Sequence, residues 1–208
     1  MDWLRRIGHS GPEAPAVGAP AEPVPAPVEG AAPGVAALLK GIGEDRSHAV
    51  LDLGPAAEQS LLVYGRFARW VRFADVLNDT GWPQAHTAGP LRTALPRPAR
   101  PYDLVFAWDI LDRLFAEDRP RLMEWLADVI APDTRLHMVM RASEDVPMRP
   151  LRFTLLDVGR IRYQPTGTSQ LPPSRLMPAD VARLLAPFHV VNAFTLRIGL
   201  REYVAARR

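Results

Sequence analysis

The sequence predicts an α/β protein with a mostly parallel, doubly wound (Rossmann-like) sheet that closes with a C-terminal antiparallel hairpin. Three observations predict this class. Apolar, β-prone runs alternate with helix-compatible segments, the run at 49–53 breaks at Gly54-Pro55 just before a helix, and only Ile198-Gly199 joins the last two β-prone runs. Alternating strands and helices are typical of a parallel sheet covered on both faces, whereas so short a connection gives antiparallel neighbours.

Length and composition are those of one α/β domain with an appendage. The chain has 208 residues, of which 48% are hydrophobic, so it is long enough to bury a sizeable core. It has no cysteine, which excludes disulfides and thiolate metal sites. The five histidines are scattered without helical pairing, so no metal site is expected.

The positive charge comes almost entirely from arginine, because Lys40 is the only lysine. The net charge is only +2, and the abundance of arginine and alanine favours a GC-biased genome over nucleic-acid binding, which needs arginines clustered on one face. No apolar run approaches the ~20 residues that span a bilayer. The N-terminus lacks the pattern of a secretory signal, so a cytoplasmic location is expected.

The N-terminal segment differs in composition from the rest of the chain. Residues 1–8 are compatible with a short amphipathic helix, either a membrane-surface element or a docking segment. Residues 10–34 contain seven prolines and few large apolar residues, which predicts an extended, disordered linker. The predicted organisation is therefore a segment and linker over 1–34 and a folded domain over 35–208.

Within that domain, the pattern predicts elements in a regular order. Pro120 and Pro178 suit first helical positions, and 104–108 is an apolar run typical of a buried parallel strand. Residues 141–176 break the alternation and are predicted to form an inserted loop, hairpin or lid. The predicted helices are 35–40, 58–69, 120–131 and 178–186, and the predicted strands are 49–53, 70–75, 104–108, 136–140, 189–197 and 200–206.

Asp52-Leu53-Gly54 resembles the first motif of the class I S-adenosylmethionine (SAM)-dependent methyltransferases, and the order of elements over 35–208 resembles their fold. The resemblance implies that SAM passes closest to the backbone at Gly54. Two further glycines usually follow in the family, and Ala56 and Glu58 stand at those positions. Alanine adds only one methyl group. Glu58 either intrudes on the amino-acid moiety of SAM, binds its α-ammonium group, or favours the start of the helix.

The resemblance extends to two further strand ends. Asp75 is implied to bind the ribose hydroxyls, with a solvated acid at a strand end as the alternative. Residues 102–114 resemble the fourth strand and turn of the family, where Trp108 is a stacking platform or a core residue and Asp109 orients a substrate or caps a helix. The third acidic motif is absent, since 88–96 has no carboxylate.

The insertion has its own implied role. Substrate-covering elements of the family vary at this position, and the arginines of 141–176 suit a carboxylate or phosphate acceptor. A solvated basic surface is the alternative.

The leading functional hypothesis is a SAM-dependent methyltransferase that acts on an unidentified acceptor, a small molecule or otherwise, with no catalytic residue assigned. The second hypothesis is a cofactor-free interaction module on the same fold, because glycine is replaced twice and the third acid is missing. A nicotinamide-dependent oxidoreductase is the third, but it needs a three-glycine turn. The candidate cofactor-binding residues are Asp52, Gly54, Ala56, Asp75, Trp108 and Asp109.

Overall fold

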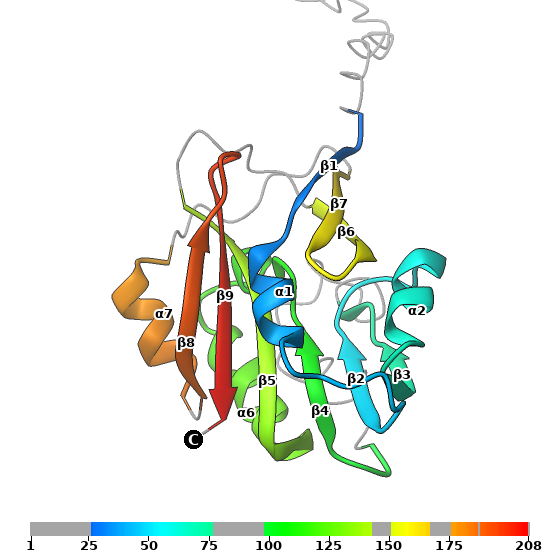
Figure 1. The fold of residues 1–208 in the computed structure, drawn as a ribbon. Helices are drawn as coiled ribbons and strands as arrows, with labels where there is room; N and C mark the ends of the chain where they lie inside the picture. The colour runs from blue at the N-terminus through cyan, green and yellow to red at the C-terminus, as the bar shows by residue number, and fades with distance from the viewer. Residues whose placement is uncertain (1–25, 77–97, 143–150, 167–175, 187, 208) are drawn as a thin grey trace, which may run out of the picture.

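A six-stranded sheet forms the centre of the molecule (Figure 1). The computed structural model describes residues 26–76, 98–142, 151–166, 176–186 and 188–207. The strand order is β3-β2-β4-β5-β9-β8; β2 to β5 run parallel, and β9 is antiparallel to both β5 and β8. The predicted fold class is therefore confirmed. The strands are β2 (His48–Asp52), β3 (Ala68–Phe73), β4 (Tyr102–Phe106), β5 (Ile130–Arg141), β8 (Phe188–Thr195) and β9 (Leu200–Arg207).

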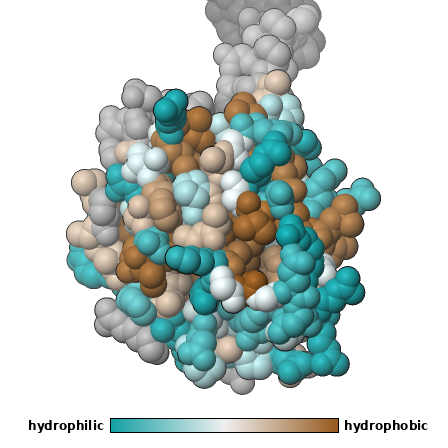
Figure 2. Space-filling view, viewed as in Figure 1, coloured by the Kyte–Doolittle hydropathy of each residue, from teal (hydrophilic) through white to brown (hydrophobic). Residues whose placement is uncertain are grey.

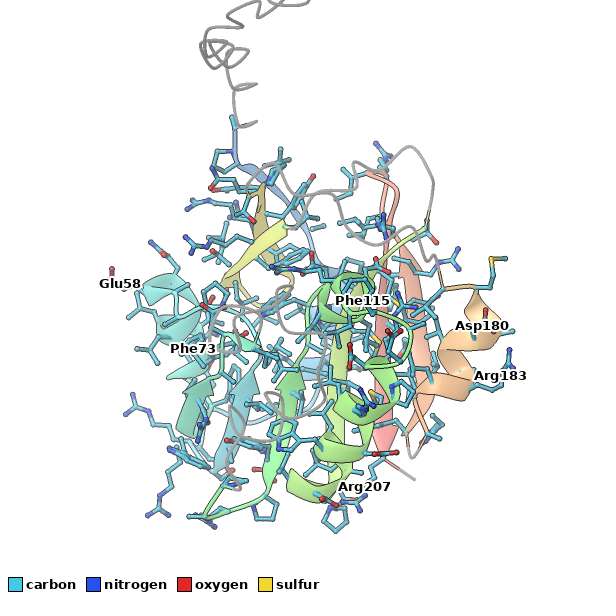
Figure 3. The ribbon with its side chains drawn as sticks, turned by 180° about the vertical axis from the view of Figure 1, so that it is seen from behind. Glu58, Phe73, Phe115, Asp180, Arg183 and Arg207 are labelled. Atoms are coloured by element: carbon cyan, nitrogen blue, oxygen red, sulfur yellow. The ribbon has the colours of Figure 1, made fainter. Side chains whose placement is uncertain are left out.

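Helices cover both faces of this sheet, as the alternating sequence pattern predicts. α1 (Pro33–Leu39) lies in front of the sheet in Figure 1, and α6 (Arg119–Val129) lies behind it, as the reverse view in Figure 3 shows. α2 (Glu58–Tyr64), α5 (Ile110–Arg113) and α7 (Pro178–Leu184) complete the described helices. α2 is shorter than the predicted 58–69, because Gly65 ends the helix and β3 begins at Ala68.

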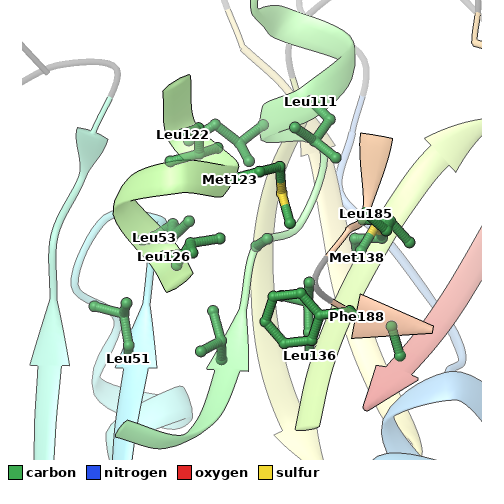
Figure 4. Packing of buried hydrophobic residues seen from close by; sticks show 14 of the residues in the cluster. Leu51, Leu53, Leu111, Leu122, Met123, Leu126, Leu136, Met138, Leu185 and Phe188 are labelled. Carbon is green, nitrogen blue, oxygen red and sulfur yellow. The ribbon is translucent and has the colours of Figure 1, made fainter. Parts of the chain in front are cut away.

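Strand side chains alternate between two hydrophobic clusters, one on each face. Leu51 and Val105 point to the α6 side, where they pack with Leu122 and Leu126 (Figure 4). Their neighbours along the strands point to the opposite side, where Val50, Leu104, Phe106 and Trp108 meet residues of α1 and α2. Burying each such side chain contributes about 1.5–3 kcal/mol, so the two clusters hold the sheet between its helices.

A second, three-stranded antiparallel sheet corrects the predicted domain boundary. β1 (Val28–Ala31) pairs with β7 (Arg160–Pro165), which pairs with β6 (Leu151–Asp157). The folded part of the chain thus includes 28–34, which the proline count assigned to the linker. Main-chain pairing stabilises β1 although it has few apolar side chains, and Pro33 is tolerated because it lies in the first turn of α1.

Several sequence predictions lie outside the described residues. They concern residues 1–25 of the predicted N-terminal segment and linker, the acid-free region 88–96 and parts of the insertion. In the described part of the chain, no helix has the length and apolar character that crossing a bilayer requires. Figure 2 shows apolar residues scattered among polar ones on the face that carries α1.

Candidate functional site

The carboxyl ends of three neighbouring strands meet at Gly54. Asp52 is the last residue of β2, and its register partners are Phe73 at the end of β3 and Phe106 at the end of β4. The amide of Asp75 donates a hydrogen bond to the carbonyl oxygen of Gly54 at 3.2 Å. In open α/β sheets ligands bind in the crevice outside this edge. The strand order therefore brings the predicted candidates from three segments to one place.

Asp52 is the polar centre of this edge. Its side chain is buried, and its carboxylate accepts three hydrogen bonds. Oδ1 accepts from the amide of Gly54 at 2.8 Å and from the indole of Trp108 at 2.6 Å, while Oδ2 accepts from the hydroxyl of Tyr64 at 2.7 Å. Both oxygens are thus committed to groups of the protein itself.

The pKa of Asp52 follows from this environment. Burial raises it to about 6, since a charge away from water is unfavourable, and the three donors act in the opposite direction. Burial also raises the pKa of Tyr64 well above its ordinary value, so its hydroxyl stays protonated and donates to Asp52. The carboxylate therefore has an internal structural role in the described conformation.

Trp108 fills the space beside Gly54. Its ring is stacked on Phe153 of β6, with centroids 5.3 Å apart and planes at 4°, and contacts the ring of His137 edge-on at 5.5 Å. Only 4% of Trp108 is exposed. Its backbone has φ of 47°, in the left-handed region that a bulky residue rarely adopts. Trp108 is thus a core residue here, held by stacking from the inserted hairpin.

The space left at this edge is small. The cavity lined by Gly54, Pro55, Trp108, Asp109 and Phe153 has a volume of about 20 Å³. That is room for about one water molecule, whereas ligand pockets measure roughly 300–1,000 Å³. As they are placed, the described side chains beside Gly54 therefore leave no room for SAM.

The neighbours of Gly54 are so close that any side chain at this position would force them to shift. A Cβ at this position would lie 3.1 Å from Cδ1 of Trp108 and 3.2 Å from Oδ1 of Asp52. The predicted close backbone approach exists, but the group that approaches is the protein's own indole.

The two residues that replace the expected glycines do not close the site. Ala56 is exposed. Glu58 is exposed in the first turn of α2, and its side chain points away from the molecule in Figure 3. Of the three interpretations of Glu58, the structure places it as a helix-start residue, where a negative charge is favourable.

Asp75 lies two residues beyond β3, half-buried, with φ of 21°. Its charge is close enough to Asp52 to contribute to the raised pKa of that residue. Asp75 and Trp108 are thus two non-glycine residues with positive φ on the strand ends that flank Gly54.

Asp109 follows Trp108 and precedes α5, but its side chain makes no capping hydrogen bond. Instead, Oδ2 accepts from the amide of Leu151 at 3.1 Å, and Oδ1 lies 3.7 Å from the guanidinium of Arg113. Burial raises the pKa of Asp109 to about 6, against the opposing effect of Arg113. Asp109 therefore attaches the start of β6 to the end of β4.

The insertion is in part a hairpin, β6–β7, and its described arginines are directed elsewhere. Arg160 and Arg162 both bind Glu29 of β1, at 3.1 and 2.6 Å. Arg152 is exposed, and among the described residues it has no ion pair. Arg160 and Arg162 thus secure β1 to the hairpin, and none of the three arginines lines the cavity beside Gly54.

Three residues with roles at this edge were not among the predicted site residues. Tyr64 binds Asp52, Phe153 stacks on Trp108, and Ser60 accepts from the amide of Leu155 at 2.9 Å through its hydroxyl oxygen. Tyr64 is the last residue of α2, the helix that directly follows Asp52-Leu53-Gly54. This closeness in sequence was the signal that could have identified it. Phe153 and Ser60 have their roles only because the β6–β7 hairpin packs against the edge. No local sequence pattern predicts that packing.

Comparison with protein-family models gives no match, and neither does comparison with curated protein sequences. Solved structures do match in fold. A SAM-dependent methyltransferase from Mesorhizobium loti has a TM-score of 0.50 and 13% identity, over 84% of this chain and 96% of that chain.

Two further solved structures match at a TM-score of 0.49. The 1,6-didemethyltoxoflavin-N1-methyltransferase of Burkholderia thailandensis, with bound 1,6-didemethyltoxoflavin and S-adenosylhomocysteine, is 18% identical over 84% of this chain and 76% of that chain. Magnesium protoporphyrin IX methyltransferase of Synechocystis PCC 6803, with bound SAM, is 16% identical over 85% and 77%. Sheet topology and the Mesorhizobium match together show that this chain has the class I SAM-dependent methyltransferase fold.

Proposed function

We propose that this protein is a SAM-dependent methyltransferase that takes its cofactor at the strand edge around Gly54, in a form more open than the one described. The observation that carries the proposal is the backbone of Asp75 and Trp108, with φ of 21° and 47° on the two strand ends beside Gly54. Such conformations cost about 1–3 kcal/mol each and cluster at ligand clamps and switch regions. The fold supports the same edge, since ligands of open α/β sheets bind there.

Opening requires that the indole of Trp108 leave its place on Phe153. That movement would release Oδ1 of Asp52 from the indole. In the open form, the backbone at Gly54 and Ala56 would approach the amino-acid moiety of SAM, and the carboxylate of Asp75 would bind the ribose hydroxyls. Trp108 and Asp109 would line the remaining side of the site.

The methyl acceptor is a small molecule or another group of unknown chemistry, because no described residue marks a site for it. No transfer step is assigned for the same reason. The cytoplasmic location expected from the sequence is part of this proposal, and cell fractionation tests it.

Titration calorimetry of the full chain with SAM and S-adenosylhomocysteine tests the cofactor. We expect both to bind, and we expect Trp108→Ala to bind SAM at least about tenfold more tightly, because the closed form then competes less with the ligand. Trp125→Ala is the matched control, since it removes an indole packed against the cluster on the other face of the sheet. No heat from either ligand at about 1 mM with the parent chain would overturn the proposal.

The second candidate is a cofactor-free interaction module. A specific observation favours it: the cavity of about 20 Å³ beside Gly54, with both carboxylate oxygens of Asp52 already bonded. SAM binding by Trp108→Ala but not by the parent would support this candidate. Replacing Ala56 and Glu58 by glycine should change little, because both residues are exposed.

A further inference from the structure

A larger cavity lies at the opposite edge of the sheet, at the amino ends of β2, β3 and β4, which form the lower edge in Figure 1. Its volume is about 480 Å³, within the range of small-molecule pockets. β2 has five residues, so about 16 Å of strand separates this cavity from Gly54. Its polar and aromatic lining includes Ser47, His48, Arg69, Trp70, Arg100 and Asp103.

The cavity has two uncommitted cations. Arg69 and Arg100 are exposed, and neither guanidinium has an ion-pair or hydrogen-bond partner in the part of the chain that the structure describes. By contrast, Oδ2 of Asp103 already accepts from the amide of Ala49 at 2.7 Å. Two guanidinium groups from different segments are well suited to an anion with several oxygens, above all a phosphate group.

The cavity also has a rigid aromatic wall. The ring of Trp70 is stacked on that of Tyr102, with centroids 5.4 Å apart and planes at 6°. Tyr102 is buried and its hydroxyl is hydrogen-bonded to Arg72, so the ring of Tyr102 is held in place beneath the stacking contact with Trp70. Trp70 nevertheless stays 36% exposed and lines the cavity. An indole supported in this way offers a flat surface on which a ligand ring can stack.

We propose that this cavity binds an organic phosphate that carries a flat ring, a class that includes the nucleoside monophosphates. Arg69 and Arg100 bind the phosphate group, and the exposed part of Trp70 receives the ring. The site is independent of SAM binding, because it lies at the other end of the strands.

Calorimetry of the full chain with AMP, adenosine and inorganic phosphate tests the site. AMP should bind, and Arg69→Gln and Arg100→Gln should each weaken it about tenfold, because each loses a charge-assisted contact. Arg152→Gln is the matched control: this arginine is also exposed and unpaired among the described residues, but lies on β6. Trp70→Leu should weaken AMP binding and leave phosphate binding unchanged.

Three results would overturn the proposal. No AMP binding at about 10 mM would remove the site, and equal affinity in the parent and the two arginine variants would place AMP elsewhere. Adenosine binding as tightly as AMP would exclude a phosphate-directed site. Circular dichroism of each variant separates loss of binding from loss of fold, and adding SAM should leave AMP affinity unchanged.

Discussion

Asp52 combines an unfavourable position with favourable partners. Burial raises its pKa from the ordinary 3.8 to about 6, which corresponds to roughly 3 kcal/mol of destabilisation at neutral pH. The hydrogen bonds from Gly54, Tyr64 and Trp108 keep that cost from being larger. A buried carboxylate with this set of donors connects β2, α2 and the end of β4 through one side chain.

Asp52→Asn should change how stability depends on pH. A carboxyl group whose pKa is raised by folding stabilises fully below its unfolded pKa near 3.8, and that contribution is lost as pH rises through about 6. Asparagine has no such ionisation. The difference in free energy of unfolding, variant minus parent, should therefore increase by about 3 kcal/mol between pH 3.5 and 7.

Urea unfolding at a series of pH values measures this difference. Asp45→Asn is a suitable control, since Asp45 is exposed and hydrogen bonds from Ser47 lower its pKa, so its pH dependence has the opposite sign. A flat difference for Asp52→Asn across this range would show that Asp52 titrates normally.

Gly54→Ala should destabilise the protein by about 1–3 kcal/mol, because its Cβ would approach Trp108 to 3.1 Å. Gly43→Ala is the matched control: the nearest atom to its Cβ would be 3.8 Å away, an ordinary contact. Chemical denaturation of both variants measures the effect, and equal stabilities would show that Trp108 moves aside freely.

At the scale of elements, the β6–β7 hairpin determines how closed the edge is. It is attached to three separate parts of the fold: the amide of Leu155 donates to Ser60 of α2, the amide of Leu151 donates to Asp109, and Asp157 pairs with Arg66 at 2.9 Å. The first contact is buried and the second is part-buried, so both matter more than the third, which is exposed.

Ser60→Ala should therefore loosen the hairpin. It leaves the buried amide of Leu155 without its partner, which costs about 1–3 kcal/mol. Hydrogen exchange at the Leu155 amide should accelerate more than exchange in β2. Ser47→Ala, at an exposed site, should stay within about 0.5 kcal/mol of the parent. Unchanged protection of Leu155 would mean that the hairpin is held without Ser60.

At the scale of the whole molecule, the two sheets share one core. The cluster under α1 and α2 contains Phe153, Leu155 and Ile161 of the small sheet together with Val50 and Val139 of the large one. Neither sheet can leave the other without exposing this apolar surface. The described parts of the chain should therefore unfold as a single unit.

Urea titrations followed by tryptophan fluorescence and by far-ultraviolet circular dichroism should give the same midpoint. Leu155→Ala should shift both curves together, by about 2–5 kcal/mol in free energy of unfolding, because it leaves a cavity in the shared core. An earlier fluorescence transition would indicate that the hairpin and Trp108 separate from an intact large sheet.

Local patterns predicted most elements of the large sheet. The apolar run 104–108 falls within one or two residues of β4, and Pro120 and Pro178 lie in the first turns of α6 and α7. A hairpin was among the predictions for the insertion, but the strand β1 was not predicted. β1 depends on main-chain pairing with β7, which lies over a hundred residues later in the chain.

The sequence by itself determined the class of fold and singled out the strand edge at Gly54 as the candidate site. Periodicity, proline positions and Asp52-Leu53-Gly54 are local properties, and local properties specify strands, helices and their order. Only the tertiary structure decided that the edge is closed by Trp108 and not by Glu58. The physical reason is that the closure depends on contacts between distant segments: Phe153 against Trp108, and Tyr64 and Trp108 against Asp52.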